Sequence, residues 1–599
     1  MPSPSFVARF LPSMLRASLA LVPFVSAFSA CTQSSDIGGP CSRFGTKGEI
    51  CSKQLYYPSG VTFDPEDRRT LYVANANADL RYSSGSVLSI DAELFDCAIE
   101  FAIEGYPAAG GGGPVCAAHF DELRAKKVGE LSGGIGCRRD LFDPSVIECD
   151  EQAFITSAVR VGNFAGSMRM QTAGVAAPAS GACHDGSAPV GGQCPSERRL
   201  WITVRGDPSI TYVRVDPAGK PGTGGPLHCD GSPSTNPDVP DSCASQRLSV
   251  RDFHQKGAPG FDCAMSNHDP CVALPQEPFG LALDQGVLST CPTGTACAPG
   301  STCGDGSACP TGVPYARLLV TYLSSGEVAL INASAFAPAS TDDINPSESV
   351  VLDVRPFFPA DPSGRRGSFG IAPREPGNPV GWWYVTSRVN PIIALFRIAE
   401  ANLILPGPSF GLSNGPFAIG DDSRDLVVDP CQPGNRGCRM FVVGNHPPSM
   451  FTVDTRIDPN RGLPQNPAGL PLDNVVEALA VCQGPSRVAL RTTMEVGPEG
   501  PRPRNRVYVN CFSDGQLLVI DPDLARAVDA VQIGRGANEI AFNFGTDETG
   551  RTLPEPLHHR AYLSDYLDGN ISVVDLDPGS LTENHVIGRI GLVDPPRIQ

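Results

Sequence analysis

A short phrase that recurs along the chain constrains its fold more than any other feature of the sequence. Near the C-terminus, AYLSDYLDGNISVVDLD (561–577) places two short apolar runs on either side of a polar turn, which is the pattern of a β-hairpin. Six related phrases precede it. Each copy opens on a large residue, and the seven are Tyr72, Trp201, Leu319, Tyr384, Phe441, Tyr508 and Tyr562.

The spacing inside these copies is shared as well. The distance from the large residue to the polar residue that closes the hairpin is the same in four copies (319 to 332, 441 to 454, 508 to 521 and 562 to 575). A slip of one residue would turn every side chain of a strand to the other face, so a common register is a strong constraint. The sequence therefore predicts equivalent hairpins.

Further strand-like phrases flank the hairpins. First strands are predicted at 58–64, 278–284, 369–373, 425–429, 476–482 and 538–544, and fourth strands at 97–103, 527–534 and 585–591. Four strands per unit, repeated in sequence, describe the blade of a β-propeller. The expected fold is all-β, a seven-bladed β-propeller with disulfide-stapled loop insertions, and 119–131 is the one short helix expected. The closing aspartates, such as Asp521 before a proline, are expected to cap turns rather than to catalyse.

Three of the phrases resemble a known repeat. LYVAN (71–75), WYVTS (383–387) and VYVNC (507–511) are similar to the YVTN-type β-propeller repeat, and the resemblance covers roughly residues 55–595. The fourth copy lacks the closing aspartate, and Leu319 replaces the aromatic residue in the third. Members of this family are mostly seven-bladed, which agrees with the seven copies, but the motif specifies a fold rather than a function.

The N-terminus has the pattern of an export signal. Two arginines precede an apolar run at 19–30, which is too short to span a bilayer as a helix but suits a secretory signal. Phe28-Ser29-Ala30-Cys31 resembles the end of a bacterial lipoprotein signal, which implies lipid attachment at Cys31; Phe28 departs from the usual aliphatic residue, and an ordinary signal cut near Ala30 is the alternative. The expected localisation is the cell envelope, as a membrane-anchored lipoprotein that faces the periplasm or the exterior.

These observations divide the chain into a signal peptide (1–30), a lipidated tether (31–54) and the propeller (55–599). Insertions are expected at about 104–153, 180–198, 228–275, 287–315 and 483–506. The chain has 21 cysteines, and setting Cys31 aside leaves an even number. Close spacing predicts disulfides for Cys41/Cys51, Cys97/Cys116, Cys137/Cys149, Cys183/Cys194, Cys229/Cys243, Cys263/Cys271 and Cys431/Cys438, and for Cys291, Cys297, Cys303 and Cys309 in a connectivity left open. Cys482 and Cys511 are expected to pair because they end the first and second strands predicted for one blade. Zinc binding is disfavoured because the chain has no CxxC pair.

Charge excludes one class of partner. The formal net charge is −18, whereas binding to phosphate backbones needs a basic face. We therefore expect no nucleic-acid partner and contact with the membrane through lipid only, while protein and polysaccharide partners stay open. No cofactor is predicted, although a divalent cation is compatible with the acidic turns.

The tight turns between the second and third strands are the expected binding rim, because loops on rigid scaffolds usually carry function. The residues assigned to this rim are Asn75, Arg205, Asp207, Arg388, His446, Asp514, Asp565 and Asp568. Arg205, Arg388 and His446 are the most informative, since a turn does not need those side chains. Solvent-exposed turns are polar whether or not they bind a ligand, so the binding rim is a hypothesis.

Three functions fit these patterns. The first is a non-enzymatic binding or scaffolding module at the cell envelope. The second is a channel-mouth enzyme, such as a lactonase-like hydrolase or an oxidoreductase. Propellers that resemble this one include enzymes of both kinds. The third is a purely structural envelope protein. His558-His559 could ligate a metal, but two histidines alone on a loop are usually solvated.

Overall fold

The computed structural model describes residues 54–592 with gaps in the connections between strands, the longest at 105–113, 126–135, 217–225, 230–239, 256–270, 336–349, 406–418 and 459–469. The signal, Cys31 and the tether lie outside the described residues except for Gln54. Within the described part of the chain, no helix is both long and apolar enough to cross a bilayer.

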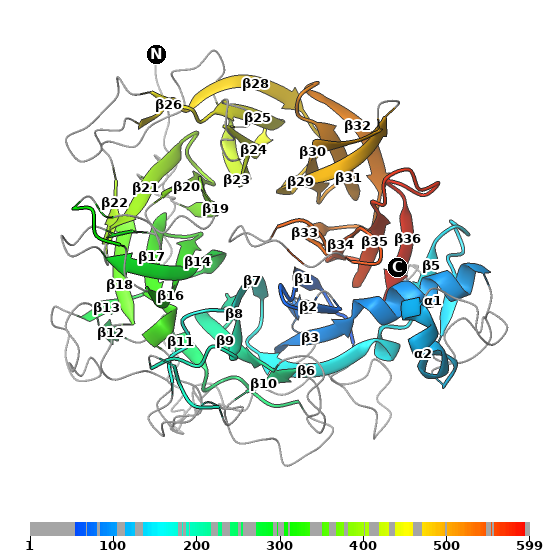
Figure 1. The fold of residues 1–599 in the computed structure, drawn as a ribbon. Helices are drawn as coiled ribbons and strands as arrows, with labels where there is room; N and C mark the ends of the chain where they lie inside the picture. Colours follow the sequence, from blue (N-terminus) through cyan, green and yellow to red (C-terminus); the bar gives the residue numbers. More distant parts are fainter. Residues whose placement is uncertain are drawn as a thin grey trace, which may run out of the picture. The chain divides into compact units, whose positions relative to one another are not determined.

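Seven antiparallel sheets follow one another along the sequence, and each forms one blade (Figure 1). Blade 1 consists of β1 (Pro58–Phe63), β2 (Thr70–Asn75), β3 (Gly85–Asp91) and β6 (Ile155–Val161). Blade 2 consists of β7 (Ala165–Gln171), β8 (Arg198–Val204), β9 (Ser209–Val215) and β10 (Leu227–His228), with β11 (Arg247–Ser249) paired to β9. Blade 3 consists of β14 (Pro278–Thr290), β16 (Val313–Tyr322), β17 (Glu327–Asn332) and β18 (Val351–Pro356), with β15 (Ala296–Cys297) paired to β14.

The remaining blades have the same plan. Blade 4 consists of β19 (Ser368–Pro373), β20 (Trp382–Ser387), β21 (Ile393–Ala399) and β22 (Asn402–Ile404). Blade 5 consists of β23 (Asp421–Asp429), β24 (Arg439–His446), β25 (Pro448–Asp454) and β28 (Asn474–Ala480). Blade 6 consists of β29 (Pro485–Gly497), β30 (Gly500–Cys511), β31 (Gln516–Asp521) and β32 (Arg526–Gln532). Blade 7 consists of β33 (Ala537–Phe542), β34 (Arg560–Asp565), β35 (Asn570–Asp575) and β36 (Val586–Ile590).

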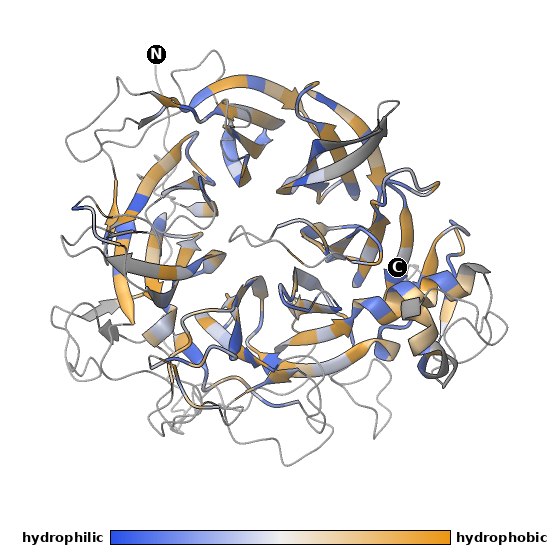
Figure 2. Ribbon diagram, in the orientation of Figure 1, coloured by the Kyte–Doolittle hydropathy of each residue, from blue (hydrophilic) through white to orange (hydrophobic). Residues whose placement is uncertain are grey.

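The innermost strands close a ring. In the order β1, β7, β14, β19, β23, β29 and β33, each contacts the next, and β33 contacts β1. Figure 2 shows apolar residues along the strands of the blades and hydrophilic residues at many of their turns. All seven large residues of the repeat are at most 1% exposed. The shared register thus places one large side chain of each blade in the core, and the prediction of a seven-bladed all-β propeller is confirmed.

One predicted fourth strand is wrong. Residues 97–103 belong to helix α1 (Ala92–Glu104), and β6 completes blade 1 instead. The apolar residues Leu94, Phe95, Ala98 and Phe101 recur at helical spacing and are all buried. The Asp91 carboxylate accepts a hydrogen bond from the Leu94 amide at 2.9 Å, which caps the first turn. The helix expected at 119–131 is α2 (Pro114–Ala125), which begins earlier.

The strand order around blade 6 also differs from the expectation. Residues 476–482, expected as the first strand of this blade, overlap β28, the outermost strand of blade 5. The segment 483–506, expected as an insertion, forms β29 and the beginning of β30, which pair as a long hairpin. Both segments have the sequence pattern of a β-strand. Only the strands with which they pair show that the first is the outermost strand of blade 5 and that the second contains the innermost strand of blade 6.

Shorter elements occupy the connections. They are β4 (Cys137–Arg139), β5 (Ile147–Cys149), β12 (Phe253–Gln255), β13 (Cys271–Ala273), β26 (Ile457–Asp458) and β27 (Leu470–Pro471), with short 3-10 turns at Glu151–Ala153 and Ala333–Ala335. β5 pairs in parallel with β36, so the first long connection extends the sheet of the last blade.

The expected disulfides within the described residues are confirmed. These are Cys97–Cys116, Cys137–Cys149, Cys183–Cys194, Cys229–Cys243 and Cys482–Cys511, and Cys303 and Cys438 are disulfide-bonded as well. The Cys482–Cys511 disulfide joins blade 5 to blade 6, whereas the sequence predicted that it would join two strands of one blade. Cys41, Cys51, Cys263, Cys291, Cys309 and Cys431 lie outside the described residues, as do the side chains of Cys271 and Cys297.

Candidate functional site

A cavity of about 1320 Å³ lies along the axis of the ring and is lined by residues of all seven innermost strands. Its walls are the later residues of these strands, such as Val61–Phe63 of β1 and Asp425–Asp429 of β23. The lining combines apolar and charged side chains. The charged lining residues are Arg169, Arg439, Arg487, Arg491, Arg504, Glu375, Asp425, Asp429, Asp523 and Glu539. Apolar walls with a few polar groups are typical of ligand pockets.

A bulge occurs near the start of every innermost strand. The pairing register shifts at Pro58/Gly60, Ala165/Met168, Pro278/Leu281, Ser368/Ile371, Ser423/Asp425, Pro485/Arg487 and Ala537/Ile540. A bulge re-aims the side chains beside it. Glycine is required at this level in blade 3, because a Cβ on Gly280 would lie 2.3 Å from the Phe369 carbonyl oxygen of the next blade.

In blades 5, 6 and 7 the equivalent residue is charged, and the three charges meet. Arg487 donates from Nε to Glu539 Oε2 at 3.0 Å, and both side chains are about one-tenth exposed. Arg487 Nη2 also donates to Ser167 Oγ at 3.1 Å. Ser167 belongs to blade 2, which is not a neighbour of blade 6 in the ring. The Arg487 side chain therefore reaches across the axis, where it also lies 5.7 Å from the centre of the Phe279 ring.

Asp425 is the third member of this group. Its Oδ2 accepts a hydrogen bond from the Val488 amide at 3.0 Å. Burial, which penalises the charged form, raises the pKa of Asp425 to about 6, while the nearby Arg487 guanidinium acts in the opposite direction. A carboxyl group of this kind changes charge near neutral pH, in a cavity wall.

Several of the other charges at the cavity form ion pairs. Arg439 contacts Asp429 at 3.0 Å and Asp523 at 2.8 Å, and Arg504 lies 3.5 Å from Asp521. Arg491 donates to the Leu490 carbonyl at 2.8 Å. The polar groups therefore come from strands and turns of blades 5 and 6 more than from the other blades.

The predicted rim lies at the other end of the ring. In six blades, the residue that follows the second strand donates its backbone amide to a carbonyl just before the innermost strand of the same blade. The pairs are Ala76 to Tyr57, Arg205 to Phe164, Leu323 to Glu277, Arg388 to Gly367, Phe512 to Gly484 and Tyr566 to Gly536. We call this end the turn face. The innermost strands begin here, and none of the eight assigned rim residues lines the cavity.

Several of the assigned residues have structural partners. Asn75 is fully buried, and its amide donates to the Gln54 carbonyl and to Ser86 Oγ, each at 3.0 Å. Asp207 is ion-paired with Arg247, and Asp568 with Arg535. The exposed Asp514 accepts a hydrogen bond from the Gln483 amide at 2.8 Å.

Asp565 is fully buried rather than on a wet rim. Its Oδ2 accepts a hydrogen bond from Ser572 at 2.5 Å, while Oδ1 has no hydrogen-bond partner. Burial, with a smaller contribution from the negative charge of Asp568, raises the pKa of Asp565 to about 8. At neutral pH this carboxyl group is therefore mostly protonated.

The structure brings two assigned residues together around one that the sequence reasoning missed. Asp422 lies 3.7 Å from Arg388 and 3.9 Å from His446, and it pairs with Arg424 at 2.6 Å. Asn445 also donates to it at 3.2 Å. The signal was the acidic and basic run DDSRD at 421–425, which stands at the start of an innermost strand.

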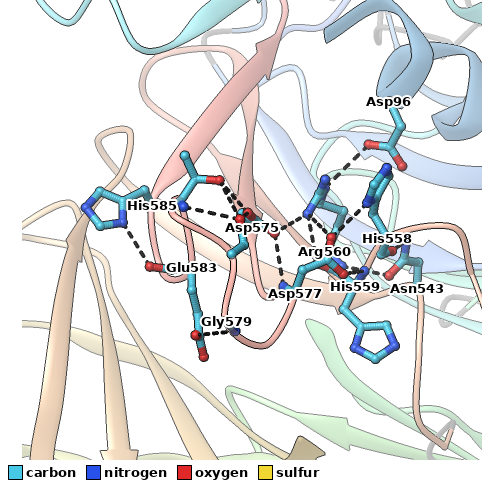
Figure 3. A network of polar contacts seen from close by, with 12 residues as sticks. Asp96, Asn543, His558, His559, Arg560, Asp575, Asp577, Gly579, Glu583 and His585 are labelled. Carbon is cyan, nitrogen blue, oxygen red and sulfur yellow. Dashed lines mark hydrogen bonds and ion pairs between the residues drawn. The ribbon is translucent and has the colours of Figure 1, made fainter. Parts of the chain in front are cut away.

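A separate polar network in blade 7 has a structural role (Figure 3). Arg560 pairs with Asp575 and, at 3.2 Å, with Asp577. His558 contacts Asp577 at 2.8 Å, and this hydrogen bond raises the pKa of His558. Arg560 also lies 3.8 Å from Asp96 of α1, so the network holds the helix against the blade. The closing aspartate Asp575 accepts hydrogen bonds from the turn that follows it, as expected.

Metal ligation has little support in the part of the chain that the structure describes. The one group there of three close candidate ligands is Cys183, Cys194 and Glu197. Its two cysteines form a disulfide with each other, which removes the thiolates that a metal needs.

No protein-family model matches this chain, and no curated protein matches its sequence. Solved structures with some likeness include a periplasmic gluconolactonase from Pseudomonas aeruginosa, with 15% identity, 80% of this chain and 86% of that chain covered and a TM-score of 0.36. Hydrazine synthase from Kuenenia stuttgartiensis has 11% identity, with 90% of this chain and 99% of that chain covered and a TM-score of 0.34. A β-propeller domain from Myceliophteria thermophila has 7% identity, with 87% of this chain and 97% of that chain covered and a TM-score of 0.37. At these values no argument rests on the likeness, and the fold assignment stands on the strand pairing.

Proposed function

We propose that this protein is an exported, lipid-anchored propeller of the cell envelope that acts as a non-enzymatic binding module, with its ligand in the axial cavity. The observation that carries the proposal is the cavity itself, which has a volume of about 1320 Å³ and walls from all seven blades. Such a volume accommodates a drug-sized molecule. The fixed ion pairs in blades 5 and 6 suit a small polar ligand that offers both donors and acceptors.

A ligand screen tests the binding role. We expect the melting temperature of the full chain to rise with one class among sugars, lactones, peptides and divalent metals, because a ligand that binds only the folded state stabilises it. Thr492→Trp should abolish the shift, since Thr492 is exposed and lines the cavity. Val528→Trp, on the exposed strand β32, is the matched control. A shift that survives Thr492→Trp, or the lack of any shift, contradicts the proposal.

Export and anchoring are tested separately. The sequence around Cys31 supports lipid attachment, and the proposal predicts that the full chain partitions into the membrane fraction. Cys31→Ser should move it to the soluble fraction of the envelope. Membrane association that is equal in both chains argues against the lipid anchor.

A lactonase-like hydrolase is the second candidate, and one observation favours it. Asp425, with a pKa of about 6, is suited to general acid–base chemistry near neutral pH, and Arg487 beside it offers a positive charge for a developing oxyanion. The test is lactone hydrolysis between pH 5 and 8. Activity that follows a group of pKa near 6 and is lost in Asp425→Asn supports the enzyme, whereas equal rates in both chains exclude Asp425 as the catalytic residue.

A further inference from the structure

A cluster of arginine and aromatic side chains surrounds the axis at the turn face, and the axial cavity does not include it. Arg205 stands in the turn between β8 and β9, and its guanidinium carbon lies 5.9 Å from the centre of the Phe164 ring and 5.4 Å from that of Phe279. Phe279 packs against Phe369 with ring centres 4.2 Å apart. Arg424 lies 5.3 Å from the centre of the Phe369 ring.

Arg205 differs from Arg388 and Arg424 because those two arginines are paired with a carboxylate. Arg388 and Arg424 share the carboxylate of Asp422. Arg205 makes no ion pair with any carboxylate within 4.0 Å among the described residues, and its guanidinium carbon lies within 6 Å of two ring centres. Burial lowers the pKa of Arg205, the charges of Tyr566 and Glu277 offset part of this effect, and the charge of Arg388 lowers the pKa further.

A partly buried cation without a counter-ion is costly in free energy, and an anionic ligand would remove that cost. A guanidinium group offers parallel donors that match the two oxygens of a carboxylate. Around it, aromatic faces provide a surface for the body of the ligand. Tyr57 and Tyr566, with ring centres 5.3 Å apart, extend this surface on the same face.

We propose that the turn-face mouth around Arg205 is a second binding site, which takes a small carboxylate that carries a ring. Arg205 binds the carboxylate, and Phe164 and the neighbouring aromatic side chains contact the ring. The site is distinct from the axial cavity, because none of the residues named for it lines that cavity; the two approach each other at the Phe279 ring, 5.7 Å from the Arg487 guanidinium carbon. Failure of the cavity screen therefore leaves this proposal intact, and the reverse also holds.

Titration calorimetry of the full chain with benzoate and glucuronate tests the site, and the pair shows whether a flat aromatic ring or a sugar ring is preferred. Benzamide and glucose are the neutral counterparts. We expect at least one carboxylate to bind, its neutral counterpart to bind about tenfold more weakly or worse, and Arg205→Gln to raise Kd by about 10- to 100-fold. Arg526→Gln, on the exposed outer strand β32, makes the same change of charge and should leave Kd unchanged.

Circular dichroism of the variants shows whether they fold. If Arg205→Gln does not fold, Phe164→Leu carries the test, because it keeps an apolar side chain but removes the ring, and it should raise Kd by about 2- to 10-fold. The proposal is overturned if neither carboxylate binds with Kd below about 1 mM, if a neutral counterpart binds equally well, or if the folded variant binds like the original chain.

Discussion

Arg487 forms a buried ion pair at the axis, and its replacement tests how much that ion pair contributes to stability. Replacement by methionine keeps much of the side-chain volume but removes the charge. Glu539, about one-tenth exposed, then loses its partner at 3.0 Å, and Ser167 loses a donor at 3.1 Å. Breaking a buried ion pair from one side costs about 3–5 kcal/mol, because the remaining charge is left uncompensated. We therefore expect Arg487→Met to lower the free energy of unfolding in urea by about this amount.

A double variant separates lost charge from lost packing. Arg487→Met combined with Glu539→Gln leaves no unpaired carboxylate from this pair, so the loss should fall to about 1–2 kcal/mol. Equal losses in the single and double variants would refute the reasoning, because they would show that the cost does not come from the unpaired charge of Glu539.

The pH dependence gives a second check on the same variant. The pKa of Asp425 is raised from its ordinary value of 3.8 to about 6, so the folded chain holds this proton more tightly than the unfolded chain. Its stabilising contribution is complete below pH 3.8 and is lost as the pH rises through 6. Arg487 limits this loss by lowering the pKa of Asp425. Its removal should therefore cost more at pH 8 than at pH 5, and a cost that is larger at pH 5 would contradict the assignment.

Three further predictions follow from single sites. Asp565→Asn should leave the melting temperature nearly unchanged at pH 4 but raise it relative to the original chain at pH 9, because the raised pKa of about 8 means that ionisation of Asp565 destabilises the folded chain as the pH rises. Asp529→Asn, at a partly exposed position of β32, is the control for the same substitution. Replacing Cys137 and Cys149 together by alanine should lower the free energy of unfolding by about 2–4 kcal/mol through loss of the cross-link, and an unchanged urea midpoint would show that the hairpin is held by pairing with β36 alone. Arg388→Ala should cost no more than about 0.5 kcal/mol in a urea melt, since the side chain is 47% exposed and 3.7 Å from Asp422, and a larger loss would place it in the core.

Local periodicity determined much of the fold. The large residues from Tyr72 to Tyr562 recur in a common register, and a strand that buries one face carries this register in its own residues. The same is true of four cysteine pairs that lie close together in sequence, whereas Cys482–Cys511 joins two blades. The number of blades and the confirmed disulfides could therefore be predicted without coordinates. The strand predicted at 97–103 failed where helical spacing and strand-like composition coincide.

Only the tertiary structure decided which residues meet across the ring. Arg487 and Ser167 are 320 positions apart, and no local pattern relates them; they are joined because the ring closes and brings blades 6 and 2 to the same axis. Burial of Asp565 was hidden for the same reason, since a turn residue is exposed or buried according to the neighbouring segment that covers it. The assignment of 483–506 to a blade also depended on pairing partners. The strand register depends on residues close together in sequence. The pKa shifts, the ion pairs and the cavity depend on neighbouring blades, which come together only when the ring closes.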